Sequence, residues 1–223
     1  MRRFADILEI AAERKGGRAA VLADMPTVLS TDALAAIPDE RWLAQMARGI
    51  LQTGISWTVV DRKWPGILEA FHGFDVVRVS MMSDDWFDAL IADTRIIRSP
   101  PKVRAVQENA VFIREIAAAH GSFGRWVGDW PAEDFAGLLA RLKADGARLG
   151  GTTGAYTLRV MGKEGYILSA SVVARLVEEG VVDKAPSSRK AWAAVQDAFN
   201  RWRAESGQSL TVISRVLAQS IDA

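Results

Sequence analysis

The 223-residue sequence predicts an all-α protein, and three observations support this fold class. Apolar residues recur every three or four positions along most of the chain, which is the spacing of one helix face. Serine, proline or acidic residues begin many of these segments, and glycine ends several of them. The best candidate for a strand, the β-branched pair Ile96 and Ile97, is too short. The pattern therefore indicates a bundle of about nine or ten helices with short connections.

The first half of the chain predicts five helices, over residues 2–13, 39–54, 56–71, 83–93 and 101–121. The first of these helices is amphipathic, with both apolar and charged residues. In the second helix, a clear apolar face begins at Trp42. Ser56 is a suitable N-cap for the third helix, in which Pro65 predicts a kink or a break. Ser83 and two aspartates begin the fourth helix, and the fifth, which is the longest, stops at Gly121.

The second half predicts helices over residues 131–146, 152–162, 169–180, 187–207 and 209–221. Pro131 begins the first of these, and Gly146 ends it. Gly150 and Gly151 then separate it from the next, which predicts a tight helix-hairpin-helix at about 138–162. Serines begin the last three helices, and Gly207 separates the last two. No linker rich in proline, glycine and serine divides the chain, so we expect residues 1–223 to form a single domain.

Composition and charge exclude several kinds of site. The chain has no cysteine, which excludes disulfides, thiol nucleophiles and zinc–thiolate sites. Its two histidines, His72 and His120, lie where helices are predicted to end, and they offer little basis for a metal site. The formal net charge is +1, so a polyanion would need a local basic patch. Acids interrupt the N-terminal apolar residues, and no run of about 18 apolar residues occurs, so we expect a cytoplasmic protein without a membrane partner.

Two segments combine basic residues with glycine or proline, and each allows two interpretations. The N–H groups of a hairpin at Gly150 and Gly151 could hold a phosphate at the positive end of the following helix. A plain connection between two helices is the commoner meaning of such a pair. Arg98 and Lys102 flank two prolines and could add phosphate contacts, whereas a solvated loop and helix face is the alternative.

Trp57 lies near the start of a predicted helix, just past a glycine break at Gly54. The chain contains eight tryptophans, and most of them must pack in the interior. A tryptophan directly after a glycine break can instead face a cleft and stack on a nucleobase. The residues alone leave both interpretations open.

Three segments taken together resemble the DNA-3-methyladenine glycosylase I family of the helix-hairpin-helix DNA glycosylases. They are QTGISW, IIRSPPKVRAVQENA and GGTTGAY, in the family's order and approximate spacing, and the resemblance covers residues 42–176. It implies a helical bundle with a cleft between two intimately packed helical subdomains. It also implies base-excision repair of double-stranded damaged DNA, in which a base of the 3-methyladenine type is flipped out and its N-glycosidic bond hydrolysed. We expect a monomer that needs no cofactor, with a hairpin loop that could hold a monovalent cation.

The resemblance also assigns site residues. It makes Trp57 the residue that stacks on the base, with Gln52, Tyr156 and Gly49 beside it. Tyr156 has a buried aromatic as its alternative, and Gln52 a surface or helix-capping role. The residues that it assigns to contacts with the DNA backbone are Gly150, Gly151, Thr152, Thr153, Arg98 and Lys102.

The sequence departs from the family's pattern at three points. Gly49 stands where the family has a glutamate that contacts the base. Without cysteines the family's zinc site between the termini cannot form, and we expect longer terminal helices in its place and no metal. Ser171 occupies the position of the superfamily's catalytic aspartate, and a serine can bind a water but cannot deprotonate it; the start of a helix is its alternative role. Two other functions therefore stay open: a non-catalytic DNA-binding or damage-sensing protein, and an all-α protein-interaction module.

Overall fold

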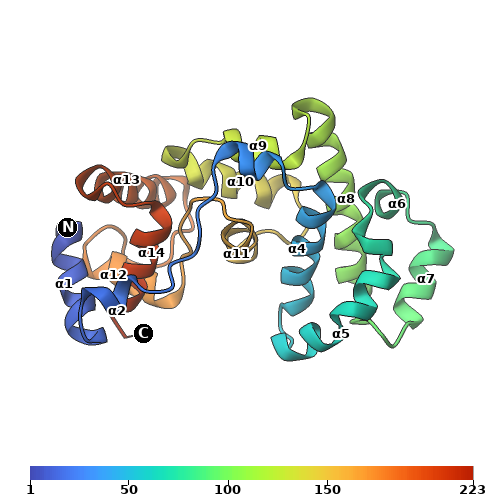
Figure 1. The fold of residues 1–223 in the computed structure, drawn as a ribbon, viewed down its shortest axis with the longest axis horizontal. Helices are drawn as coiled ribbons and strands as arrows, with labels where there is room; N and C mark the ends of the chain where they lie inside the picture. Colours follow the sequence, from blue (N-terminus) through green and yellow to red (C-terminus); the bar gives the residue numbers. More distant parts are fainter. Residues whose placement is uncertain (223) are drawn as a thin grey trace. The chain divides into compact units, whose positions relative to one another are not determined.

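The computed structural model describes residues 1–222, and its regular structure over that range is helical throughout, as predicted (Figure 1). The helices are α1 (Phe4–Lys15), α2 (Arg18–Leu22), α3 (Thr31–Ala35), α4 (Asp39–Gln52), α5 (Trp57–Ala70), η1 (His72–Phe74), α6 (Val76–Ser80), α7 (Asp84–Ala92), α8 (Pro100–His120), α9 (Phe123–Asp129), η2 (Ala132–Asp134), α10 (Phe135–Asp145), α11 (Thr153–Val160), α12 (Ala170–Glu178), α13 (Arg189–Ser206) and α14 (Leu210–Gln219). The elements labelled η are single turns of 3₁₀ helix.

One expectation about the helices is wrong, and another is narrowed. The described residues contain more than ten helices, because α2, α3 and α6 have five residues each and are too short to show a periodic apolar face. Pro65 does not break its helix, since α5 continues from Trp57 to Ala70. Val60 and Ile67 are fully buried on either side of the proline, and this packing holds the helix together across the missing hydrogen bond. His120 ends α8 as predicted, whereas His72 begins the separate helix η1.

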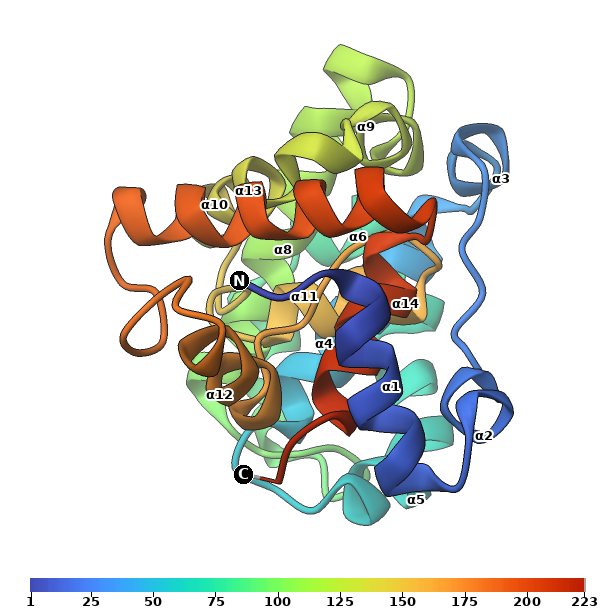
Figure 2. The same ribbon diagram turned by 90° about the vertical axis from the view of Figure 1, so that its left-hand side faces the viewer.

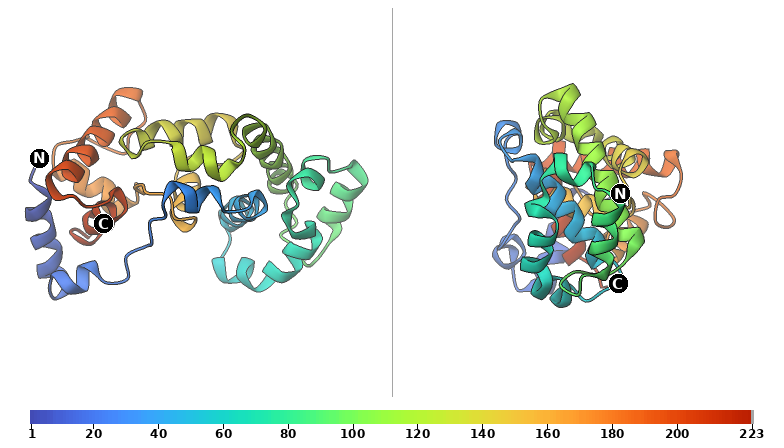
Figure 3. Two further views of the ribbon diagram at one scale, coloured as in Figure 1. Left: turned by 45° about the horizontal axis from the view of Figure 1, so that its top comes forward. Right: turned by 90° about the vertical axis from the view of Figure 1, so that its right-hand side faces the viewer.

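The chain divides into two compact units. The hairpin unit comprises residues 30–129 and 139–157, and the terminal unit comprises residues 1–29, 130–138 and 158 onward. In the hairpin unit, α8 packs against α4, α6, α7 and α9. The chain of short helices from α5 through η1 and α6 to α7 is turquoise to green in Figure 3. An aromatic cluster fills the unit's interior, with the Phe123 ring 5.4 Å from Trp42 and 5.6 Å from Phe112.

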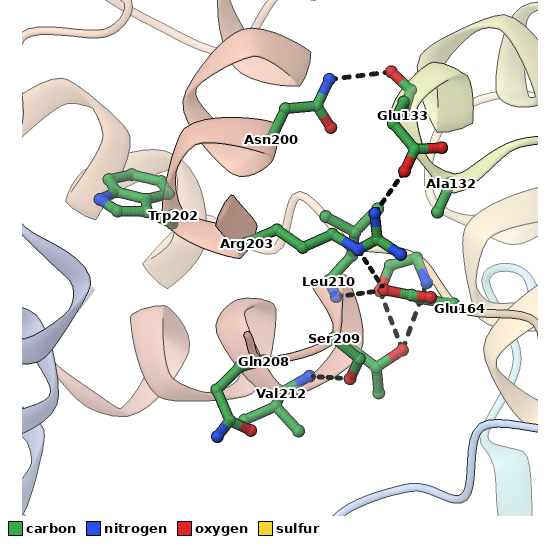
Figure 4. A network of polar contacts seen from close by, with 12 residues as sticks. Ala132, Glu133, Glu164, Asn200, Trp202, Arg203, Gln208, Ser209, Leu210 and Val212 are labelled. Carbon is green, nitrogen blue, oxygen red and sulfur yellow. Dashed lines mark hydrogen bonds and ion pairs between the residues drawn. The ribbon is translucent and has the colours of Figure 1, made fainter. Parts of the chain in front are cut away.

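In the terminal unit, both ends of the chain pack together. The N-terminal helix α1 lies against α13 and α14, and α14 also contacts α12 (Figure 2). The Tyr166 ring stacks on Phe199 at 4.2 Å in the interior. A polar network joins η2, α13 and the start of α14 (Figure 4). In it, Glu164 accepts hydrogen bonds from Arg203 Nε at 3.2 Å and from the Leu210 N–H at 2.9 Å.

Candidate functional site

An exposed aromatic pair marks the candidate site in the hairpin unit. Trp57 is the first residue of α5, and its side chain is 61% exposed. Tyr156 lies in α11, is 41% exposed, and meets the indole edge-on with ring centroids 6.4 Å apart. The interpretations of both residues as buried core aromatics are therefore wrong. Two large aromatic rings that share a surface position without being covered are a common feature of binding sites.

Gly49 lies at a close approach between α4 and α11. A Cβ atom at this position would be 3.3 Å from Thr153 Cγ2 and 3.6 Å from Thr157 Oγ1. Because Gly49 has no side chain, the start of α11 packs directly on α4, and Thr153 lies against Gly49. Because Tyr156 belongs to this first turn of α11, the same packing carries its ring toward Trp57.

Lys102 anchors the end of α4. Its ammonium donates to the carbonyl oxygens of Leu51 at 3.1 Å and Thr53 at 2.7 Å, on either side of Gln52. A lysine bound to the last carbonyls of a helix also complements the negative end of the helix dipole. Burial lowers the pKa of Lys102, and the nearby positive charge of Arg148 lowers it further. The predicted contact between Lys102 and a DNA phosphate would have to compete with these two hydrogen bonds.

The Gln52 side chain points to an aspartate on the next helix. Its Nε2 donates to Asp61 Oδ1 at 3.4 Å. The same oxygen accepts from Arg48 Nη2 at 2.6 Å and from Arg48 Nε at 3.2 Å. Asp61 lies one turn after Trp57 on α5, so the two side chains lie on the same helix face. Sequence reasoning missed Asp61, although its spacing from Trp57 was a usable signal.

The hairpin between α10 and α11 has the bounds that the glycines predict. α10 ends at Asp145 and α11 begins at Thr153. Gly151 and Arg148 have left-handed backbones, with φ of 61° and 58°. The Gly154 N–H closes the turn by donating to the Leu149 carbonyl at 3.2 Å. The loop surface offers Gly151 and Thr152 to solvent, with Gly150 and Thr153 half-buried.

A buried asparagine holds this hairpin from outside. Asn109 lies in α8 and is 0% exposed. Its Nδ2 donates to the Ala147 carbonyl at 2.9 Å, and its Oδ1 accepts the Ala147 N–H at 3.0 Å. The side chain thus mimics a strand neighbour and fixes the loop's position on α8. Sequence reasoning missed this residue; a single asparagine on the apolar face of a long helix was the available signal.

Arg98 and Ser171 are the remaining predicted site residues. Arg98 is exposed just before α8 in the hairpin unit. Ser171 belongs to the terminal unit, where it is the second residue of α12 and half-buried. Ser169, and not Ser171, caps that helix, since its side chain accepts the Val172 N–H at 3.3 Å. Ser171 therefore lies in the first turn of α12, as its alternative role predicts, while its neighbour Ser169 provides the cap.

The residues present do not fit a zinc site. The sequence has no cysteine, and within residues 1–222 no group of three or more His, Cys, Asp and Glu side chains is placed to hold a metal ion. In the same range, no helix is long and apolar enough to span a bilayer.

Comparisons with known proteins place this group of residues in a family context. The sequence profile of methyladenine glycosylases matches residues 37–157, which include Gly49, Gln52, Trp57 and Tyr156 but not Ser171. DNA-3-methyladenine glycosylase 1 of Escherichia coli (strain K12) is 37% identical over 59 residues, which is 26% of this chain and 32% of that protein. The chain thus matches about a third of the length of this relative.

Two solved structures share the fold. A crystal structure of 3-methyladenine DNA glycosylase I is 24% identical, with a TM-score of 0.50 over 65% of this chain and 87% of that one. The Staphylococcus aureus 3-methyladenine DNA glycosylase I is 22% identical, with a TM-score of 0.51 over 62% of this chain and 80% of that one.

Proposed function

Because this chain belongs to the methyladenine glycosylase family, we propose that it is a DNA N-glycosylase of base-excision repair. It flips an alkylated base of the 3-methyladenine type out of damaged duplex DNA and hydrolyses its N-glycosidic bond. The observation that carries the proposal is the exposed Trp57–Tyr156 pair beside a glycine-rich hairpin in the matched segment. Flipping a base costs a few kcal/mol, which stacking on an exposed indole offsets.

The proposed reaction needs little acid catalysis. A 3-methylated adenine in DNA is cationic, so when the bond from C1′ to the base nitrogen breaks, the electron pair neutralises the leaving base. A water oxygen then forms the new bond to C1′ and loses its proton to solvent. The protein must mainly hold the base and admit water. In this proposal Ser171 serves at most to orient that water, since a hydroxyl cannot deprotonate it.

The hairpin and Arg98 hold the DNA backbone in this proposal. The backbone N–H groups of Gly150 and Gly151, with Thr152 and Thr153, face a phosphate at the start of α11. Arg98 supplies a second cationic contact. Lys102 acts indirectly, because it fixes the end of α4 beside the stacked base.

Further parts of the proposal concern composition and assembly. We expect the enzyme to act as a monomer without zinc, and residues 1–223 to form a single glycosylase domain of two packed subdomains. A monovalent cation would bind hairpin carbonyls other than those of Ala147 and Leu149, which already accept hydrogen bonds.

Base release tests the proposal. Duplex DNA treated with a methylating agent is incubated with micromolar protein, and free bases are separated by chromatography. We expect 3-methyladenine above the level released without protein. No release, with DNA binding intact, would leave the non-catalytic damage-sensing function, which the lack of a carboxylate at Gly49 and Ser171 favours.

DNA affinity should fall steeply with salt. Contacts to roughly four phosphates predict a slope of about −4 when the logarithm of the association constant is plotted against the logarithm of salt concentration. Fluorescence anisotropy of a labelled duplex between about 50 and 200 mM salt measures it. Binding that is absent or independent of salt would instead support a protein-interaction module.

A further inference from the structure

We infer that Gln52 recognises the flipped base through its side-chain carbonyl, and that Asp61 fixes this orientation, so the site selects a base with an N–H donor on its edge. The 6-amino group of adenine is such a donor, whereas guanine has an acceptor at the equivalent position. The inference rests on the proposed function, in which a base is flipped into the site. It adds that the Gln52 side-chain carbonyl distinguishes one base from another.

The orientation follows from the chemistry of a carboxylate. An ionised aspartate has only acceptors, so a glutamine beside it must turn its NH₂ group toward it. Arg48 donates two hydrogen bonds to the Asp61 carboxylate, both to Oδ1. The Arg48 guanidinium is itself placed over the Trp64 ring, 5.1 Å from its centroid. The Gln52 amide therefore has one orientation, with Nε2 on Asp61 and Oε1 directed away from it.

The carbonyl that results is free for a ligand. Between residues 1 and 222, no hydrogen bond occupies Gln52 Oε1, and the side chain is half-buried. The backbone around it cannot shift easily, because Lys102 binds the carbonyls of Leu51 and Thr53. The Ile55 N–H also donates to the backbone carbonyl of Gln52 at 3.1 Å. A fixed acceptor on a fixed backbone is the requirement for reading a base edge.

The position of Gln52 suits this role. It follows Gly49 by three residues on α4, so both lie on one helix face. Gly49 faces α11, whose Tyr156 meets Trp57, and Asp61 follows Trp57 by one turn of α5. Gln52 thus lies on α4, which contacts both helices that carry the aromatic pair, α5 and α11. Where a glutamate was expected at position 49, the chain offers a neutral acceptor one turn later.

The variant Asp61→Asn tests the inference with almost no change of shape. An asparagine can donate as well as accept, so the Gln52 amide becomes free to present either end. The probes are 3-methyladenine and 3-methylhypoxanthine, which carry an amino group and a carbonyl at the same position. We expect the wild-type protein to bind 3-methyladenine about fivefold more tightly, and Asp61→Asn to lose that preference. Ligand-observed NMR titration measures both affinities without requiring catalysis.

Controls separate this effect from a general loss of structure. Asp32→Asn breaks another exposed ion pair of the hairpin unit, with Arg125 at 3.2 Å, and should leave the preference unchanged. Gln52→Leu should abolish the preference while stacking persists. A preference that survives in Asp61→Asn, or a wild type that binds neither base or both equally, would overturn the inference. Selective binding without any base release would contradict the proposed function and leave the inference standing.

Discussion

Replacing Trp57 with alanine should lower kcat/KM for base release by roughly tenfold to a hundredfold. Stacking of one base on an aromatic ring contributes about 1–3 kcal/mol, and the alanine variant loses the larger of the two exposed rings. The fold should be unaffected, because the indole is 61% exposed and meets Tyr156 only at its edge. Single-turnover release of 3-methyladenine measures the loss of activity. Far-UV circular dichroism of the wild type and Trp57→Ala checks that the fold is unchanged.

Two further variants make this result specific. Trp57→Phe keeps a flat ring and should retain release to within about threefold, since a smaller ring still stacks. Met81→Ala removes an apolar side chain of the same unit that is 70% exposed, and it should have no effect. Release that is equal in the wild type and in Trp57→Ala would show that the base binds elsewhere.

The helices that could be predicted are those with local signals at their ends. Proline begins α8 and glycine follows it, so its bounds were correct to within one residue. The glycines at 150 and 151 likewise located the hairpin between α10 and α11. By contrast, α3 has only five residues, which rarely form a helix alone, so its packing against α9 adds to the cap that Ser30 provides. At Pro65 the helix continues, so of the kink or break that the proline predicts, the break does not occur.

In the candidate site, too, local motifs were predictable from the sequence and contacts between distant residues were not. Trp57 and Tyr156 could be identified from short motifs, but their contact joins residues far apart in the chain. The hydrogen bonds of Asn109 and Lys102 span 38 residues to the hairpin and about 50 to the end of α4. No pattern of neighbouring residues predicts such pairs. Nor does a local pattern indicate that the Lys102 ammonium binds the carbonyls of Leu51 and Thr53, and its contact with DNA stays a prediction.

Replacing Arg175 with alanine should lower the free energy of unfolding by about 3–5 kcal/mol, the cost typical of removing one member of a buried ion pair. Arg175 is only 2% exposed. Its Nε donates to Ser220 Oγ at 2.8 Å, and its Nη1 lies 3.4 Å from Glu179 Oε1. Glu179 in turn accepts the Arg2 N–H at 2.7 Å and Arg2 Nη1 at 2.6 Å. One buried network thus ties both termini to α12, in a chain whose residues do not fit zinc.

Denaturant unfolding followed by circular dichroism measures this loss, with Arg201→Ala as the matched control. Arg201 forms an exposed pair with Glu205 in the same unit, and its removal should cost less than about 0.5 kcal/mol. A loss for Arg175→Ala no larger than the control's would contradict a stabilising role for the network.

The dependence of stability on acidic pH should show whether the Glu179 charge accounts for the stability that Arg175→Ala loses. Burial raises the pKa of Glu179, but the Arg2 N–H, the Arg2 side chain and Arg175 together bring it below its usual value. A carboxyl whose pKa is lower in the folded state stabilises the protein above its unfolded pKa of about 4.3, and that stabilisation is lost as pH falls through the folded pKa. The difference between the wild type and Arg175→Ala should therefore narrow below about pH 4. A difference that stays constant in acid would assign the loss to the neutral bonds with Ser220 and to packing, rather than to Glu179.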